Sequence, residues 1–194
     1  SSVQTITGSI TDINAAYAST GITGLGDAAV TVTSPSSVAD LNTLDGTTTG
    51  VITATVTDTD TATLKTLTGT NHDYTITISD TSIAATDLNT IDSKTTVEVN
   101  ATSVTTITGS IADINTSYSS SGITGLGDET ITLSDSTISA SDLNTLNTAT
   151  NGNIDATSVQ TITGAIADIN TAYALTGIIG LGDETVTVTS PSAV

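Results

Sequence analysis

The chain has 194 residues, which is enough for one substantial domain or two small ones. It contains no Cys, Met, Trp or Phe and only 4 Tyr, so its hydrophobic core must consist of Ile, Val, Leu and Ala. The 20 acidic residues face two lysines and no arginine, giving a net charge of −18. This charge argues against binding to nucleic acid or to an anionic membrane surface, because both require basic side chains. No run of about 18 apolar residues is present, so we expect no membrane insertion.

Three nearly identical segments organise the chain: residues 2–34, 103–134 and 158–190. Each segment starts with a TITG stretch, continues through a D-I-N block and ends with G-L-G-D before a Thr-rich stretch. D-L-N blocks stand between the segments, and TATLKTL at 61–67 is a degenerate copy. With this degenerate copy counted, the blocks recur every 22 to 29 residues; the aspartates of the others are Asp12, Asp40, Asp87, Asp113, Asp142 and Asp168. Such a period is typical of stacked repeats and is too short for separate sandwich domains.

Each repeat contains a strand signal followed by a helix signal. Residues 74–78 and 185–189 alternate apolar and polar side chains with period two, as strands do. The D-[IL]-N blocks instead place apolar residues three apart, as in Val38, Leu41 and Leu44, which predicts one or two turns of helix. A serine three residues before the aspartate predicts a capping box that satisfies the first amides of the helix. These serines are Ser9, Ser37, Ser110 and Ser139.

Together these signals predict a repeat solenoid, namely a parallel β-solenoid of about seven coils with short helical turns at one corner. A variant similar to leucine-rich repeats stays open. The array fills residues 1–194, which we expect to form a single solenoid domain with no room for a separate catalytic domain. Neither end carries a divergent polar repeat. We therefore expect a fragment of a longer array, or a subunit that packs end to end on other copies of itself or on flanking repeats.

The repeat motifs resemble those of a known group of proteins. ADLNT and ADINT-Y blocks alternate with SVQTITG and ITGLGDE, and this pattern is similar to repeats of very large predicted surface or secreted proteins of marine cyanobacteria and their relatives. The resemblance covers nearly the whole chain. It implies an extracellular or cell-surface location and a structural role, and it identifies no functional residue. A looser likeness is to bacterial leucine-rich repeats, although their Asn after L-x-L is absent.

Carboxylates follow the Gly-Leu-Gly turn in every second repeat. They are Asp27, Asp128, Glu129, Asp183 and Glu184. Calcium prefers several oxygen ligands, and these carboxylates could bind it together with the backbone carbonyls of a flexible turn. The alternative is that the acids are solvated and only screened by salt. The sequence thus predicts Ca²⁺ as a candidate ligand of these residues and requires no cofactor.

Other polar residues indicate a structural use. The repeated asparagines could bond backbone groups of adjacent repeats, or they could point outward as polar surface; they are Asn14, Asn42, Asn89, Asn115, Asn144 and Asn170. We expect Tyr17, Tyr118 and Tyr173 to fill the edge of the core. His72 is the only histidine, and without Cys there is no thiol nucleophile. The acids are repeated rather than unique, so we expect no enzyme.

The sequence therefore favours a non-catalytic structural or adhesive spacer of a large extracellular surface or secreted repeat protein. Three alternatives stay open. The chain could be a self-assembling filament subunit, or a calcium-binding module, or an ice-binding module that presents rows of threonine from its many T-x-T runs. Alternating apolar residues within those runs also fit ordinary strands with one buried face.

Overall fold

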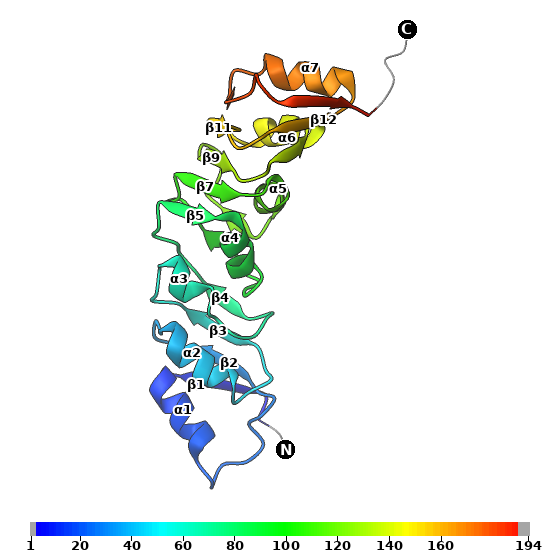
Figure 1. Cartoon of the computed structure of the whole chain (residues 1–194). Coiled ribbons are helices and arrows are strands. Elements are labelled where there is room, and N and C mark those ends of the chain that lie inside the picture. Colours follow the sequence, from blue (N-terminus) through cyan, green and yellow to red (C-terminus); the bar gives the residue numbers. More distant parts are fainter. Residues whose placement is uncertain (1–2, 190–194) are drawn as a thin grey trace. The chain divides into compact units, whose positions relative to one another are not determined.

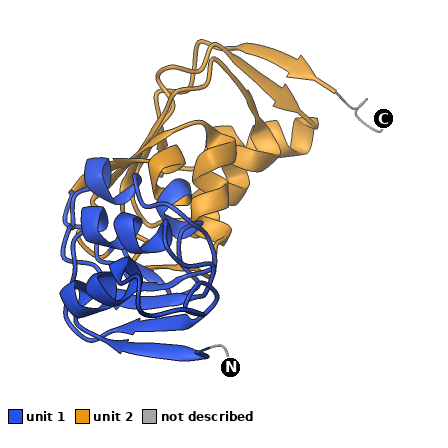
Figure 2. Cartoon of the chain, turned by 90° about the horizontal axis from the view of Figure 1, so that it is seen from below, with its two compact units in different colours: residues 1–80, 90–101 blue, residues 81–89, 102–194 orange. Residues whose placement is uncertain are grey.

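The computed structural model describes residues 3–189. Two compact units make up the chain, Ser1–Asp80 with Thr90–Ala101 (unit 1) and Thr81–Asn89 with Thr102–Val194 (unit 2; Figure 2). One to three strands lie between successive helices in the described residues (Figure 1). The strands are β1 Thr5–Gly8, β2 Ala29–Val32, β3 Ile52–Thr55, β4 Asp73–Thr75, β5 Ser82–Ala84, β6 Val99–Asn100, β7 Thr106–Gly109, β8 Ile123–Thr124, β9 Thr130–Leu133, β10 Thr137–Ser139, β11 Ile154–Asp155, β12 Thr161–Gly164, β13 Ile178–Ile179 and β14 Thr185–Val188. The helices are α1 Ile10–Ala18, α2 Val38–Asp45, α3 Thr61–Leu64, α4 Ala85–Asp92, α5 Ile111–Ser119, α6 Ala140–Ala149 and α7 Ile166–Ala174.

All sheets inside the two units are parallel and pair equivalent positions of successive repeats. Unit 1 holds the sheet β1-β2-β3-β4, and unit 2 holds β5-β7-β9-β11-β13 and β10-β12-β14. Ile107 pairs with Ile131, and Ile162 pairs with Val186. Because side chains alternate along a strand, this register places β-branched apolar residues on the inner face and threonines on the outer face.

The fold class differs from the predicted one. The chain is an α/β fold with seven helices in residues 3–189 and several parallel sheets, so the prediction of a parallel β-solenoid with short helical corners is wrong. Six of these helices have 8 to 10 residues instead of one or two turns. Their length follows from packing, because apolar side chains such as Leu41 and Leu44 are buried along them. Threonine is accommodated inside these helices, where the hydroxyls of Thr43 and Thr116 donate to the carbonyls of Ala39 and Ala112. The prediction that residues 1–194 form one domain stays a prediction.

The helices bury their apolar faces against the sheets. In the D-L-N helices the buried side chains include Leu41 and Leu44 of α2 and Leu143 and Leu146 of α6, all fully buried. Each such leucine contributes about 2 kcal/mol to the free energy of unfolding. In unit 2, helices α5, α6 and α7 pack side by side (Figure 2). Within the described part of the chain, no helix has the length and hydrophobicity needed to cross a bilayer.

Capping boxes start three of the helices as predicted. The hydroxyls of Ser9, Ser37 and Ser110 accept from the amide of the aspartate three residues later and donate to its carboxylate. The predicted box at Ser139 is wrong. Its hydroxyl bonds that of Ser141 and makes no cap hydrogen bond, because a second hydroxyl competes inside the first turn.

A second kind of cap comes from the following repeat. The amide of the first residue in three helices donates to an aspartate carboxylate about 20 residues further along the chain. These pairs are Val38 to Asp58 at 2.7 Å, Thr61 to Asp80 at 2.6 Å and Ile111 to Asp135 at 2.7 Å. Negative charge at a helix start is favourable because the first amides lack intrahelical partners. These three aspartates therefore stabilise helices of the fold.

Four of the repeated asparagines bond the backbone of the next repeat, which was the first of the two predicted alternatives. The side-chain amides of these four donate to backbone carbonyls of the next repeat: Asn42 to Thr66, Asn89 to Asp113, Asn115 to Asp142 and Asn144 to Asp168. The links made by Asn89 and Asn144 differ in the partner of the side-chain oxygen. The Oδ1 atom of Asn89 accepts from the Ser117 hydroxyl at 2.6 Å, whereas the buried Oδ1 atom of Asn144 has no partner among the described residues. The sequence explains the difference, because Ala172 stands where the other copy has Ser117.

We expect the substitution Ala172→Ser to stabilise the protein by about 1 kcal/mol, because it supplies a donor to the Asn144 Oδ1 atom. Ala172 is buried and lies in the middle of α7, where serine is tolerated in the equivalent helix α5. Urea unfolding followed by circular dichroism measures the difference. The reverse change, Ser117→Ala, is the matched control and should destabilise by a similar amount. Equal stability of Ala172→Ser and the parent chain would contradict the expectation.

Candidate functional site

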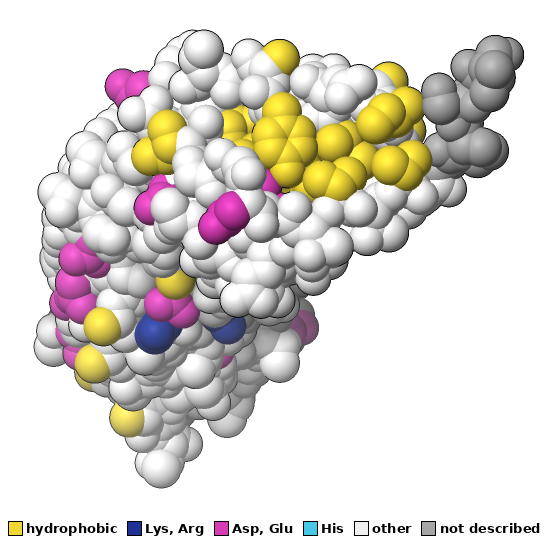
Figure 3. Space-filling model, turned by 45° about the horizontal axis from the view of Figure 1, so that its top comes forward, with side chains coloured by type: hydrophobic (Ala, Val, Ile, Leu, Met, Phe, Trp, Pro, Cys, Tyr) yellow, Lys and Arg dark blue, Asp and Glu magenta, His cyan; other side chains and the backbone are white. Residues whose placement is uncertain are grey.

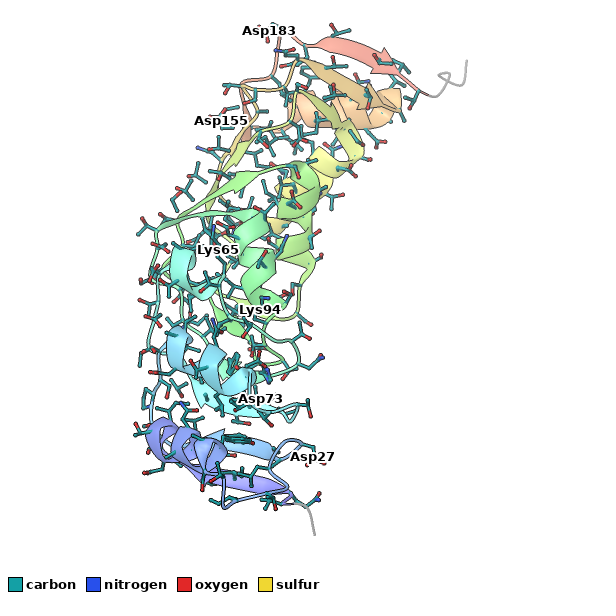
Figure 4. All side chains as sticks on the ribbon, turned by 60° about the horizontal axis from the view of Figure 1, so that its bottom comes forward. Asp27, Lys65, Asp73, Lys94, Asp155 and Asp183 are labelled. Carbon is teal, nitrogen blue, oxygen red and sulfur yellow. The ribbon has the colours of Figure 1, made fainter. Side chains whose placement is uncertain are left out.

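The predicted calcium ligands lie in the loops that precede β2, β9 and β14. Asp27, Asp128 and Asp183 are exposed at the ends of their Gly-Leu-Gly turns, and Figure 4 shows Asp27 and Asp183 in these loops. Glu129 and Glu184 follow directly, but their carboxylates accept from the tyrosine at the end of the preceding helix, and only Glu129 is buried. The structure therefore places the aspartate and the glutamate of one loop in different surroundings.

Glu129 is the fully buried acid of this set. Its Oε2 atom accepts from the Tyr118 hydroxyl at 2.6 Å and from the Gly127 amide at 2.9 Å. Its Oε1 atom is buried and has no hydrogen-bond partner within residues 3–189. Burial, and then the hydrogen bond to Glu129, raise the pKa of Tyr118 well above its ordinary value. The tyrosine therefore keeps its proton and acts as a donor to the carboxylate.

The same arrangement occurs in the last copy. The Glu184 Oε2 atom accepts from the Tyr173 hydroxyl at 2.7 Å and from the Gly182 amide at 2.9 Å. Burial acts to raise the pKa of Glu184, but the Gly182 amide and the Tyr173 hydroxyl outweigh burial and lower it below the ordinary value of 4.5. Burial, followed by the hydrogen bond to Glu184, raises the pKa of Tyr173 to about 12. Both partners thus favour the neutral tyrosine beside the ionised glutamate.

The first copy lacks the glutamate. Ala28, which is fully buried, occupies its position, and the Tyr17 hydroxyl donates to the Leu25 carbonyl at 3.1 Å instead. The tyrosine therefore keeps a partner in all three copies, with a carboxylate in two of them. The sequence signal for this pairing is the spacing of eleven residues in Tyr118–Glu129 and Tyr173–Glu184, which the sequence interpretation missed.

These hydrogen bonds define what the loop carboxylates can do. Glu129 and Glu184 direct oxygens toward O–H and N–H donors, and no three His, Cys, Asp or Glu side chains lie close enough to hold a metal ion in the part of the chain that the structure describes. Calcium binding by Asp27, Asp128, Glu129, Asp183 and Glu184 stays a prediction. The contacts that the structure places here fix the loop to the end of its own helix.

We expect the contribution of the Tyr173–Glu184 pair to the free energy of unfolding to be constant between about pH 4.5 and 10 and to fall outside this range. Glu184 determines the acid limit, and Tyr173 determines the alkaline limit. The lowered pKa of Glu184 contributes stability above its unfolded value of 4.5, which is lost as the pH falls through the folded value. The raised pKa of Tyr173 contributes stability below its unfolded value of 10.0, which is lost as the pH rises toward about 12. Urea unfolding across this pH range tests both limits.

The control for this pH dependence is Tyr173→Phe. It removes the alkaline contribution of that residue and weakens the acid one, because Glu184 keeps only the Gly182 amide as a partner. An unchanged pH profile in the variant would show that this pair does not couple stability to pH.

The loop is also held by the repeat that follows it. The Thr48 hydroxyl donates to the Ala28 carbonyl at 3.1 Å, and the equivalent Thr150 hydroxyl donates to the Glu129 carbonyl at 3.2 Å. The backbone approaches so closely that a Cβ atom on Gly50 would lie 2.0 Å from the Ala28 carbonyl oxygen. A Cβ atom on Gly152 would lie 2.0 Å from the Glu129 carbonyl oxygen. Only glycine fits at these two turns.

His72, the single histidine of the sequence, forms a hydrogen bond with a carboxylate. Its Nε2 atom lies 2.8 Å from the Asp45 Oδ1 atom, and its Nδ1 atom accepts from the Ile52 amide at 3.1 Å. The ring also packs on Tyr74 with centroids 5.1 Å apart. Both nitrogens of this buried ring are occupied by the protein, so neither is available to take a proton from a substrate. The arrangement joins β3 and β4 to the end of α2.

A cavity of about 350 Å³ lies between α5 and α6 in unit 2. Its lining consists of Asn115, Thr116, Tyr118, Ser119, Thr145, Thr148 and Ala149. The hydroxyls of Thr116, Thr145 and Thr148 donate to carbonyls of their own helices. No charged side chain lines the cavity, so it is an open gap between two helices that is lined by uncharged side chains.

Comparisons with known proteins give no relative for this chain. No known protein family matches the sequence, no curated protein is similar to it, and no solved structure matches its fold. The function must therefore be inferred from the residues themselves.

Proposed function

We propose that this chain is a non-catalytic structural spacer or adhesive segment of a large extracellular surface or secreted repeat protein. Its role is to hold a stack of equivalent repeats in a fixed register. It requires no cofactor, and its partners are further repeats of the same kind. The high negative charge keeps such a segment soluble and free of nucleic acid.

The observation that carries this proposal is the use of the repeated polar residues. The asparagine amides reach carbonyls of the next helix, and Asp58, Asp80 and Asp135 cap the helix of the preceding repeat. Glu129 is bonded by Tyr118 and Gly127. Carboxylates and amides of the kind that serve catalysis or ligand binding in other proteins here hold each repeat together or bond it to its neighbour. Such a pattern suits a segment that resists mechanical unfolding.

Pulling the chain from both ends in a single-molecule force experiment tests this role. The chain is placed between two folded marker domains and extended in buffer with EDTA and in buffer with calcium. We expect distinct unfolding peaks at the same force in both buffers, because the contacts between repeats need no ion. Extension without any peak would contradict the role of a spacer that resists mechanical unfolding. A higher force in calcium would support the calcium-binding alternative.

One observation favours a second candidate, the binding of ordered water or ice. On the outer face of the sheet β10-β12-β14, Thr137, Thr161 and Thr185 stand in register. The row beside it contains Ser139, Thr163 and Thr187. A flat array of hydroxyls and methyl groups at strand spacing suits such a function. A thermal-hysteresis assay tests it, and a freezing point equal to that of an acidic control protein would discard it.

A further inference from the structure

The apolar face of β14 is exposed, whereas the same face of the equivalent strands is covered. Val186 and Val188 are 45% and 46% exposed, but Val30 and Val32 at the same positions of β2 are 1% and 7% exposed. In β9 the equivalent residues Ile131 and Leu133 are also buried. Figure 3 shows hydrophobic side chains gathered on this face of the molecule. The α7–β14 face is therefore an inner surface of the repeat that lacks its neighbour in residues 3–189.

The covered copies show what such a neighbour must provide. A further parallel strand lies beside β2 and β9, namely β3 and β11. The amides of Val30 and Ile131 donate to carbonyls next to these strands, both at 2.8 Å. The partner of β14 must therefore offer a parallel strand edge with apolar residues on its inner face.

The helix layer gives an independent requirement. The side-chain amide of Asn144 in α6 donates to the Asp168 carbonyl of α7, and Asn89 and Asn115 make the same contact to the next helix. Asn170 is the equivalent residue of α7, and its side chain is exposed. Ile166 and Tyr173 of the same helix are 37% and 40% exposed. The partner must therefore carry a D-[IL]-N helix as well as the strand.

The N-terminal side of the chain presents such a strand and helix. In the sheet of unit 1, β1 pairs with β2 and has no strand on its other edge among residues 3–189, whereas the equivalent strand β12 is paired on both sides. Val3 is 37% exposed, but its equivalents Val104 and Val159 are buried. Ile22 is 47% exposed, but its equivalent Ile123 is buried. The α1–β1 face is thus also an inner surface of the repeat.

We propose that the α7–β14 face binds the α1–β1 face of a second copy, head to tail. The edge of β14 pairs with the edge of β1 in parallel, and the Asn170 amide of one copy donates to the Asp12 carbonyl of the other. This inference rests on the proposed structural role, because it names the partner of that role. A head-to-tail contact leaves one free face at each end, so it extends to longer assemblies.

Charge decides the conditions of assembly. Each copy carries a net charge of −18, so two copies repel each other at low ionic strength. Salt screens this repulsion and strengthens the burial of apolar surface. We expect association to increase between 0.05 M and 1 M sodium chloride.

Sedimentation velocity over a concentration series in 1 M sodium chloride tests the contact. We expect species heavier than the 19.2 kDa monomer for the parent chain, and at least tenfold weaker association for Val186→Asp, because a carboxylate would be buried in the interface. Thr187→Asp is the matched control. It adds the same charge on the same strand, but on the opposite face, and should associate like the parent. A parent chain that is monomeric at all concentrations would overturn the inference and leave the force experiment on the spacer unaffected.

A mixing experiment tests the direction of the contact. We expect Val186→Asp and Val3→Asp to be monomeric when separate, because each has lost one of the two faces. An equimolar mixture should form heterodimers of twice the monomer mass and nothing larger, since only one intact pair of faces remains. Self-association of either variant alone at the parent's strength would overturn the head-to-tail arrangement. Circular dichroism of each variant confirms that the exposed substitutions leave the fold intact.

Discussion

Replacement of Gly152 by alanine should destabilise the protein by about 3 kcal/mol, the largest effect that we expect from adding a single methyl group. The new Cβ atom would lie 2.0 Å from the Glu129 carbonyl oxygen and 2.5 Å from its carbon, so the turn must move away from β9. That movement also breaks the bond from the Thr150 hydroxyl to the same carbonyl. Urea unfolding monitored by circular dichroism measures the loss.

The matched control is Gly26→Ala. Gly26 lies in the loop that the equivalent turn of unit 1 covers, and a Cβ atom there meets nothing within 4 Å. We expect a change within about 0.5 kcal/mol for this variant. Gly50→Ala repeats the main test in unit 1, where the Cβ atom would overlap the Ala28 carbonyl. A tolerated Gly152→Ala would mean that the contact between loop and turn is not close in solution.

Loss of the hydroxyl of Tyr118 should destabilise by about 2 kcal/mol, because the fully buried Glu129 carboxylate would keep only the Gly127 amide as a donor. Tyr17→Phe is the natural comparison. It removes a bond to the neutral Leu25 carbonyl and should cost about 1 kcal/mol. Chemical unfolding of the two variants under identical conditions gives the difference.

A double-mutant cycle isolates the carboxylate contribution. Glu129→Ala turns the last part of this repeat into the arrangement of the first copy, where Ala28 is buried and tyrosine bonds a carbonyl. We therefore expect Tyr118→Phe to cost less in the Glu129→Ala background than in the parent chain. An equal cost in both backgrounds would show that Tyr118 acts through packing and not through Glu129.

The local structure of the repeats was largely predictable from the sequence. Serine and aspartate three residues apart predicted the boxes at Ser9, Ser37 and Ser110, because the hydroxyl and the carboxylate act on amides within one turn. The contacts of Asn42 and Asn144 with the next repeat were one of the two alternatives that the repetition of these residues predicted. Such features depend on neighbours in sequence or on exact repetition, which the sequence displays directly.

The fold class was not predictable in the same way. Apolar spacing at Val38, Leu41 and Leu44 marked the buried face of α2, but it did not show that the helices pack against one another beside the sheets. Threonine alone favours a strand, although Thr145 lies inside α6 and its hydroxyl donates to the Ser141 carbonyl. The balance between strand and helix was therefore misjudged, and an α/β fold was taken for a solenoid.

The loop site shows a different limit. Proximity to glycine and negative charge suggested an ion for Glu129, but the tyrosine that bonds it comes from the end of the preceding helix. The capping roles of Asp58 and Asp135 were missed for the same reason, since both act on a helix about 20 residues earlier. Contacts of this kind follow from how strands register, which the spacing of repeats does not determine.

The carboxylate caps give the chain a direction. Asp58 and Asp80 belong to the stretch after the helix that they complete, so melting of a later repeat removes a cap from the earlier one. Melting of an earlier repeat leaves the cap of the later helix in place. Local unfolding should therefore propagate more easily toward the N-terminus than toward the C-terminus, because each of these helices is capped by the repeat that follows it.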